Sequence, residues 1–286
     1  MAQPRINVED RPAPAIRRLA GRQYFVHMAF SLAGKWVLIT GASSGFGAAA
    51  AAAFGALRCN LLLGARRLER LEATAAMAIR AGAAQAVFHD LDVTQTSSVE
   101  AFVQWARTKA SAVDVLINNA GGAHGLDSVA AGRDEDWEAT LQTNVLGLLR
   151  VTRAVLPMMP KDAGSSILNI GSVAGRFAYE GGAAYCAAKA GELKITQVLR
   201  LELNGTGIRI GSIDPGMART EFGLVRFKGD EARADKVYEG VHPLVAEDVA
   251  EAMVWVATRP PHVNIDEMVI KSVDQAATFK VFRRSS

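Results

Sequence analysis

Short apolar runs that contain almost no polar residues recur along this chain, and they constrain its fold more than any other feature. We expect these runs to be strands, at residues 36–40, 60–64, 86–90, 113–118, 166–170, 208–213 and 268–271. Strands that are apolar at nearly every position, rather than at alternate positions, are buried on both faces. The pattern therefore predicts a parallel sheet of about seven strands with helices packed on both sides.

Longer segments with helical periodicity separate these runs. The expected helices cover residues 48–57, 67–81, 96–109, 134–158, 184–203 and 246–258. Alternating strands and helices joined by right-handed crossovers build a doubly wound α/β sheet. A chain of 286 residues, of which 50% are hydrophobic, is long enough for one such domain. We therefore expect a single-domain Rossmann fold over residues 34–286, including a C-terminal tail.

The first 33 residues do not share this pattern. They hold five arginines and end in a short apolar patch at residues 24–33. The patch is too short for a secretory signal, and Glu9 and Asp10 are unusual in a transit peptide. We expect residues 1–33 to form a flexible arm outside the domain, with Met28 as an alternative start.

Composition argues against several classes of function. The net charge is only +3 and the Lys and Arg residues are scattered, so nucleic-acid binding is not expected. No apolar run approaches the roughly 20 residues that span a bilayer. Cys59 and Cys186 lie far apart and match no disulfide or metal-binding pattern. We expect a cytoplasmic protein without a metal, whose partner is a small-molecule substrate rather than nucleic acid or a membrane.

A glycine-rich segment follows the first expected strand, with glycines at positions 41, 45 and 47. Glycines allow a sharp turn, a close approach to a pyrophosphate and tight packing of the next helix, whose free N–H groups attract phosphate. Because the cluster stands between a strand and a helix, it predicts a dinucleotide site. The expected contacts are Gly41, Ser43, Ser44, Gly45, Phe46 and Gly47.

The end of the second expected strand bears on the choice of cofactor. An acidic residue there would bind a ribose 2′-hydroxyl, whereas a 2′-phosphate needs a cation. The strand ends at Arg66 and Arg67 with no acidic residue in reach, and guanidinium groups suit a phosphate. We therefore expect NADP(H), bound in part by these arginines; the alternative is that both are solvated at a helix start. Asp92 and Val93 are expected at the adenine, unless Asp92 caps a helix.

Tyr185 and Lys189 stand four residues apart in an expected helix and so share one face. A nearby ammonium group favours the ionised form of a phenol, which can exchange a proton with an alcohol or carbonyl oxygen. Ser172, at the end of a strand, could hydrogen-bond the same oxygen. Asn144 could bend the long helix locally and hold a water molecule that relays protons to Lys189. These four residues are the expected catalytic group.

In combination these motifs resemble the classical short-chain dehydrogenases/reductases, from residue 35 to about residue 275. The resemblance implies that Tyr185 is the general acid/base and Ser172 the ligand of the substrate oxygen. It implies that Lys189 favours ionisation of the phenol and that Asn144 takes part in the relay. The further cofactor contacts that it implies are Asn118, Asn119, Ala120, Gly121, Tyr185, Lys189, Pro215, Gly216 and Thr220.

Within that family, the C-terminal third is most similar to the NADP-dependent serine and L-allo-threonine 3-dehydrogenases, which are 3-hydroxy acid dehydrogenases. The similar segments are residues 179–182, 220–222, 225–230 and 261–265. The resemblance implies oxidation of the β-hydroxyl of small 3-hydroxy acids in a homotetramer, or a homodimer. The chain departs from the pattern at 122–124 and 217–219, which are expected to line the substrate cavity.

A carboxylated substrate needs a cationic partner. Arg226 is the candidate, with Arg176 and Arg219 as alternatives. Tyr179 and Phe222 are expected to provide an apolar wall. The charged, turn-rich segment 221–240 is expected to be a lid that orders over the substrate.

Two other functions are compatible with these residues. The chain could be an NADPH-dependent reductase of bulkier ketones or diketones. It could also be a non-catalytic NADP-binding regulator, although the intact set of Ser172, Tyr185 and Lys189 argues against that.

Overall fold

The structure, a computed structural model, describes residues 30–161 and 164–284, together with residues 18–19 and 22–23. The two short pieces pair as antiparallel strands β1 (Arg18–Leu19) and β2 (Arg22–Gln23). The rest of the expected arm, up to residue 29, lies outside the described residues. In the part of the chain that is described, no helix is long and apolar enough to cross a membrane.

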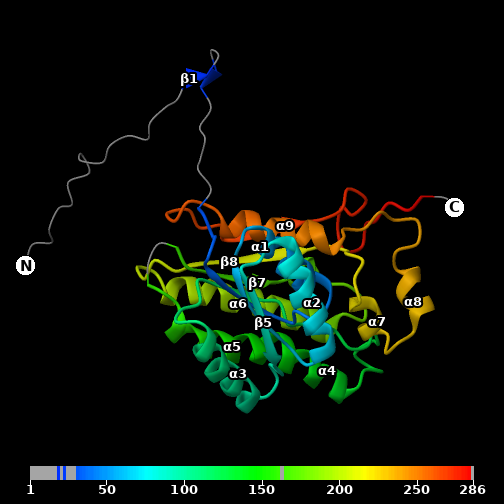
Figure 1. The fold of residues 1–286 in the computed structure, drawn as a ribbon. Helices are drawn as coiled ribbons and strands as arrows, with labels where there is room; N and C mark the ends of the chain where they lie inside the picture. Colours follow the sequence, from blue (N-terminus) through cyan, green and yellow to red (C-terminus); the bar gives the residue numbers. More distant parts are fainter. Residues whose placement is uncertain (1–17, 20–21, 24–29, 162–163, 285–286) are drawn as a thin grey trace, which may run out of the picture.

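A parallel sheet of seven strands forms the centre of the molecule (Figure 1). In spatial order the strands are β5 (Gln85–Asp90), β4 (Asn60–Ala65), β3 (Trp36–Thr40), β6 (Val115–Asn118), β7 (Ser166–Ile170), β8 (Arg209–Pro215) and β9 (Glu267–Ile270). All neighbours in the sheet pair in parallel. Each strand lies close to its expected bounds, and the sheet confirms the predicted doubly wound Rossmann fold.

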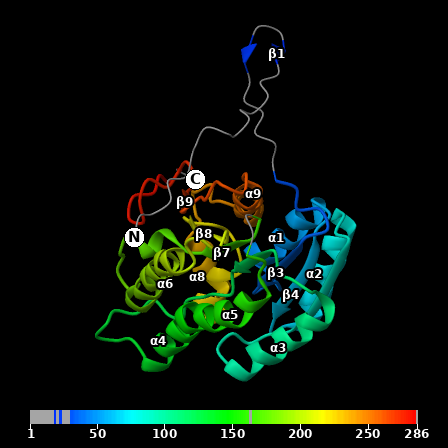
Figure 2. The ribbon, with the colours of Figure 1, turned by 90° about the vertical axis from the view of Figure 1, so that its left-hand side faces the viewer.

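Helices cover both faces of this sheet (Figure 2). One face carries α1 (Gly45–Ala56), α2 (Leu68–Ala81) and α9 (Ala246–Ala257), and the other carries α3 (Thr96–Lys109), α5 (Gly147–Val155) and α6 (Ala183–Glu202).

The two cores explain why the strands are apolar throughout. Val37 and Ile39 of β3 belong to the core that contains Phe54 of α1. Leu38, between them, belongs to the opposite core, which contains Phe102 of α3. Alternate side chains of a strand point to opposite faces, so a sheet covered on both faces needs apolar residues at every position.

The segment that was expected to be one helix over residues 134–158 is divided. It consists of α4 (Asp134–Leu141), a π-helix (Gln142–Leu146), α5 and a 3₁₀ turn (Leu156–Met158). Asn144 lies in the π-helix, and its side-chain Nδ2 donates to the carbonyl oxygen of Thr140 at 2.7 Å. In a regular helix the backbone N–H four residues later would use that oxygen. The helix is therefore locally irregular at Asn144, the position at which a bend was expected.

Two other segments differ from expectation. Helix α1 begins at Gly45 rather than at residue 48, so the glycine motif itself forms the first turn. Two short helices, α7 (Phe222–Arg226) and α8 (Glu231–Lys236), occupy the segment that was expected to be turn-rich. The side chain of Asp230 accepts a hydrogen bond from the backbone of Arg233 at 2.9 Å and so caps α8.

Candidate active site

A cavity of about 580 Å³ opens at the carboxyl ends of the parallel strands. Residues that directly follow six of these strands line it, which is where α/β folds bind ligands. The cavity brings together most of the residues predicted from the sequence: Gly41, Ser43, Ser44, Gly45, Phe46, Arg66, Arg67, Asp92, Val93, Asn119, Ala120, Gly121, Ser172, Tyr179, Tyr185, Lys189, Pro215, Gly216, Thr220, Phe222 and Arg226. Gly47, Asn118 and Asn144 are not among the lining residues.

The loop after β3 has the shape that a dinucleotide needs. Gly41 and Gly45 have positive φ angles of 65° and 52°, in the region that favours glycine. A Cβ on Gly47 would lie 2.5 Å from the carbonyl oxygen of Gly41. Gly47 therefore packs α1 against the loop instead of lining the cavity. The loop leaves the N-terminus of α1 free to meet a pyrophosphate, so these residues fit the expected cofactor.

Asn118 and Asn119 have different roles, although both were expected beside the cofactor. The Nδ2 group of Asn118 donates to Thr152 Oγ1 and to Asn169 Oδ1, both at 2.9 Å, inside the core. Asn119 Nδ2 donates to the carbonyl oxygen of Thr40 at 2.9 Å and so joins β3 to the loop after β6. Asn118 is not among the residues that line the cavity, because its amide ties β6, β7 and α5 together. Its expected contact with the cofactor stays a prediction.

Thr40 is a structural part of the site that sequence reasoning did not assign. Its hydroxyl accepts hydrogen bonds from the backbone N–H groups of Asn119 at 3.0 Å and Ala120 at 2.9 Å. The threonine thereby fixes the loop after β6 against the glycine loop. A hydroxyl residue at the last position of an otherwise apolar strand was the available signal.

The arginines after β4 lie at the cofactor end of the cavity. Arg67 donates to Ser43 Oγ at 3.2 Å and to Ser44 Oγ at 2.7 Å, and pairs with Glu221 at 3.0 Å. Arg70 binds the same carboxylate. Partial burial acts to raise the pKa of Glu221, but the hydrogen bonds from Arg70 and Arg67 hold it below its ordinary value. Arg67 is therefore not a merely solvated residue, and Glu221 is a contact that the sequence did not reveal.

Asp92 does not cap the following helix. That helix, α3, begins at Thr96, and Gln95 occupies the N-cap position without a side-chain capping hydrogen bond. Instead, Asp92 Oδ1 accepts hydrogen bonds from the backbone N–H of Thr94 at 2.9 Å and from its hydroxyl at 2.7 Å. These bonds close a turn that holds Asp92 and Val93 at the cavity wall. The contact with adenine stays a prediction.

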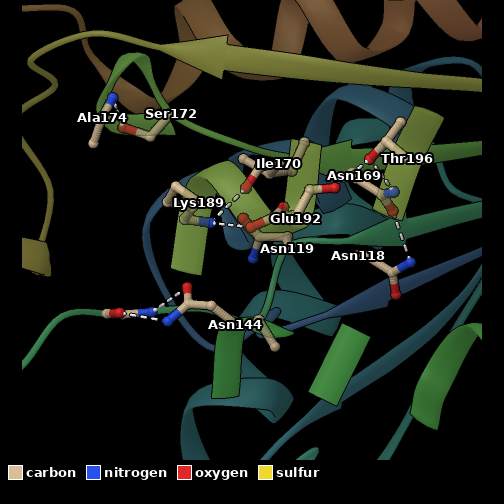
Figure 3. Close-up of polar contacts among 12 residues, drawn as sticks. Asn118, Asn119, Asn144, Asn169, Ile170, Ser172, Ala174, Lys189, Glu192 and Thr196 are labelled. Carbon is tan, nitrogen blue, oxygen red and sulfur yellow. Dashed lines mark hydrogen bonds and ion pairs between the residues drawn. The ribbon is translucent and has the colours of Figure 1, made fainter. Parts of the chain in front are cut away.

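Tyr185 and Lys189 lie in the first two turns of α6, as expected. Lys189 Nζ is 5.9 Å from the centre of the Tyr185 ring. It donates to the carbonyl oxygen of Ile170 at 2.8 Å and to Glu192 Oε2 at 2.7 Å (Figure 3). Burial by itself would lower the pKa of Lys189, but the negative charges of Glu192, Tyr185 and Asp214, together with the hydrogen bond to Glu192, outweigh it, and the pKa lies above its ordinary value.

Glu192 is a third residue that sequence reasoning missed, after Thr40 and Glu221. Burial raises its pKa to about 7, although the charge of Lys189 acts in the opposite direction. The available signal was an acidic residue three positions after the lysine of the Tyr-x-x-x-Lys motif, since such residues are neighbours on a helix.

Ser172 and Asn144 approach the reaction centre from other elements. Ser172 follows β7, lines the cavity and accepts a hydrogen bond from the backbone of Ala174 at 3.1 Å. Asn144 Nδ2 donates to the carbonyl oxygen of Gly122 at 2.7 Å, and its Oδ1 accepts from the Gly122 N–H at 3.2 Å. A Cβ on Gly121 would lie 2.7 Å from Asn144 Oδ1 and 3.5 Å from Lys189 Nζ. The backbone at Gly121 therefore lies close to both groups.

Arg226 reaches the same centre from α7. Its Nη1 donates to the Tyr179 hydroxyl at 2.9 Å and its Nε donates to the carbonyl oxygen of Gly125 at 3.1 Å. Its guanidinium carbon lies 5.8 Å from the centre of the Tyr185 ring. The Phe222 ring is 5.3 Å from that ring. Burial raises the pKa of Tyr179 to about 12, although Arg226 opposes the shift.

The two alternative arginines, Arg176 and Arg219, form ion pairs with acidic side chains of the protein. Arg176 forms ion pairs with Asp214, at 2.6 Å, and with Glu267. Arg219 pairs with Asp235 at 3.5 Å and stacks on the Tyr238 ring at 4.9 Å. Neither is free in the way that a carboxylate-binding residue would need, so Arg226 is the better candidate.

This arrangement places a phenol, a hydroxyl and a lysine beside a glycine loop that fits a pyrophosphate. It is the arrangement of a nicotinamide-dependent oxidoreductase, because it provides both a dinucleotide site and a group that can exchange a proton with an alcohol oxygen.

Comparisons with known proteins agree with this class. The sequence pattern of the family described as short chain dehydrogenase matches residues 35–229. The chain is 42% identical to a sulfoacetaldehyde reductase of Chromohalobacter salexigens over 241 residues, which cover 84% of this chain and 94% of the relative. It is 38% identical to an NADP-dependent 3-hydroxy acid dehydrogenase of Schizosaccharomyces pombe over 256 residues, 89% of this chain and 99% of the relative.

A solved structure of a serine dehydrogenase in complex with NADP⁺ is also similar. It superposes with a TM-score of 0.80 at 37% identity, over 87% of this chain and 100% of that one. The chain belongs to the short-chain dehydrogenase family. The prediction of an NADP(H)-dependent oxidoreductase that acts on CH–OH groups is thereby confirmed.

Proposed function

We propose that this enzyme interconverts a small anionic alcohol and the corresponding carbonyl compound, with Arg226 holding the anionic group. One observation carries the proposal. The buried Nη2 of Arg226 has no hydrogen-bond partner among the described residues, and no acidic side chain in that part of the chain forms an ion pair with it. A buried guanidinium donor without a partner is unfavourable, and a carboxylate or sulfonate of the substrate would satisfy it.

The reacting groups take the roles expected from the sequence. The hydride would be supplied or accepted by NADP(H) when it is bound. Tyr185 takes the hydroxyl proton when the alcohol is oxidised and returns it when the carbonyl is reduced. Ser172 holds the substrate oxygen, and Lys189 favours ionisation of the phenol and would hold the ribose of the cofactor. Asn144 supports the exchange of protons through water.

The names of the relatives narrow the substrate class. A 3-hydroxy acid and sulfoacetaldehyde share one arrangement, in which a single carbon separates the anionic group from the carbon that reacts. A guanidinium group 5.8 Å from the ring of Tyr185 suits an anion at that short separation. We therefore propose small 3-hydroxy acids such as serine or L-allo-threonine, together with the equivalent sulfonates.

A substrate panel with Arg226→Met tests this proposal. Loss of a charge-assisted hydrogen bond of about 1.5–3 kcal/mol should lower kcat/KM about 10- to 150-fold for serine, 3-hydroxybutyrate and isethionate. The value for a neutral alcohol such as propan-1-ol should change little. Arg219→Met is the matched control, because Arg219 lies on the same segment but is already paired. Equal losses for anionic and neutral substrates, read from NADPH absorbance, would contradict the proposal.

The same panel addresses bulkier ketones and diketones. Tyr179 and Phe222 border the cavity beside Arg226, and we propose that they exclude large neutral substrates. A higher kcat/KM for a diketone than for every anionic substrate would favour the alternative.

We further propose that one domain covers residues 34–286 and that four such chains assemble. The outer faces of the helices offer apolar side chains: Leu149 is 40% exposed, Val198 42% and Leu201 79%. Light scattering should give the mass of a homotetramer, and Leu201→Lys should lower it if α6 forms an interface. A cytoplasmic location is proposed because Cys59 and Cys186 are both free thiols.

A further inference from the structure

Glu192 is a buried acidic residue with no place in the reaction described above. It is 3% exposed, and Lys189 is 6% exposed. Lys189 Nζ donates to Glu192 Oε2 at 2.7 Å and to the carbonyl oxygen of Ile170 at 2.8 Å (Figure 3). An ammonium group has three donors. Two of them are therefore used on the protein side, and the third remains for a partner in the active site.

The charges around Glu192 make it the counter-ion of Lys189. Among the described residues, the charged groups that act on it are Lys189 on its own helix and Asp214 on β8. Asp214 is itself paired with Arg176 at 2.6 Å. An isolated buried ammonium group is strongly unfavourable. The positive charge beside Tyr185 therefore depends on the Glu192 carboxylate.

A small second cavity lies against Glu192. Its volume is about 10 Å³, and its polar lining residues are Glu192, Asn144, Asn118 and Thr40. A polar space of this size suits one water molecule. The Oδ1 atom of Asn118 is buried there without a hydrogen-bond partner among the described residues. Glu192 thus borders both the lysine and a polar space next to Asn144.

We propose that Glu192 is a positioning residue for the reaction, which holds the Lys189 ammonium group beside Tyr185 and keeps it charged. Glu192 does not line the main cavity, so it acts through Lys189 and not on the substrate. The inference rests on the oxidoreductase activity and is independent of which anionic alcohol is the substrate.

Matched variants on one helix test the role. Glu192→Gln keeps the size of the side chain and a hydrogen-bond acceptor but removes the charge, whereas Glu202→Gln makes the same change at an exposed position of α6. We expect Glu192→Gln to lower kcat about tenfold or more with a change in KM of less than about threefold. Glu192→Asp should recover part of the loss, and Glu202→Gln should behave as the unaltered enzyme.

Three readouts separate this role from a purely structural one. Carboxyl NMR of ¹³C-glutamate-labelled enzyme should show one carboxyl that titrates near pH 7, absent from Glu192→Gln and present in Glu202→Gln. In the pH profile of kcat/KM, the decrease at acid pH should show this ionisation in the unaltered enzyme but not in Glu192→Gln. Thermal unfolding should show coupling, so that Glu192→Gln lowers Tm in the unaltered enzyme but not in a Lys189→Met background.

Three outcomes would overturn the proposal. The first is a Glu192→Gln enzyme with the kcat and pH profile of Glu202→Gln. The second is an equal loss of Tm with and without Lys189. The third, measured on the unaltered protein and so independent of how well the variants fold, is a Glu192 carboxyl that stays protonated at the pH at which the enzyme is fully active. A loss of activity that affects anionic substrates but not neutral ones would instead concern the proposed role of Arg226.

Discussion

Replacement of Gly47 by alanine should weaken the cofactor site, although alanine favours helices. The added Cβ would lie 2.5 Å from the carbonyl oxygen of Gly41 and 2.6 Å from Asn119 Nδ2. Real Cβ contacts are essentially never shorter than 3.0 Å, so the loop must move by at least 3.0 − 2.5 = 0.5 Å. The amide that would be displaced holds the carbonyl oxygen of Thr40 at 2.9 Å.

Two opposing effects set the magnitude. Alanine in place of glycine inside a helix gains about 1 kcal/mol, whereas overpacking a close contact costs about 1–3 kcal/mol. The net loss of unfolding free energy should therefore be about 0–2 kcal/mol. The loop that moves is the one expected to bind the pyrophosphate, so the Kd for NADPH should rise about tenfold or more, equivalent to about 1.4 kcal/mol.

Fluorescence titration with NADPH and thermal unfolding measure both effects. Gly191→Ala is the matched control, because a Cβ there would lie 3.7 Å from Val145 Cγ2, an ordinary contact. It should be neutral or stabilising and should leave cofactor binding unchanged. If Gly47→Ala binds NADPH within twofold of the unaltered enzyme, the close packing at this loop does not control the cofactor site.

Two further substitutions and one labelling experiment have defined outcomes. Tyr185→Phe should lower kcat about 10²- to 10⁴-fold in stopped-flow or steady-state assays, while NADPH still binds, because only the acid/base group is lost; a loss below tenfold would refute that role. Glu221→Gln should tighten NADP(H) by up to about fivefold, since it frees Arg67 from an exposed ion pair worth about 0–1 kcal/mol, and weaker binding would contradict this. Burial, helped by the charge of Asp114, raises the pKa of Cys59 to about 12, so mass spectrometry after iodoacetamide at pH 8 should find Cys186 alkylated and Cys59 unmodified in the folded enzyme.

Local patterns predicted the fold and the proximity of Tyr185 to Lys189 because their causes are local. A strand buried on both faces must be apolar throughout, as Val37, Leu38 and Ile39 show by joining two opposite cores. Residues four apart on a helix share a face, so the proximity of Tyr185 to Lys189 follows from the helix alone and does not depend on the rest of the chain.

The partners of charged and amide side chains depend on distant elements, and the sequence carries no such signal. Arg176 looked available for a carboxylate, but the neighbouring strands β8 and β9 bring Asp214 and Glu267 to it. Asn118 and its neighbour Asn119 point to different surroundings at the end of one strand. Glu192 escaped notice because acidic residues are ordinarily exposed.

Because of the π-helix at Gln142–Leu146, the number of residues in this segment matters to the site as much as their types do. Each residue of a helix rotates the side chains after it by about 100° around the helix axis. The wider turn offsets α5 from α4, so that Val151 and Val155 meet the sheet while Asn144 reaches Gly122. Deleting one residue here would restore a regular helix, but it would turn either the amide away from the reaction centre or the apolar side chains away from the core.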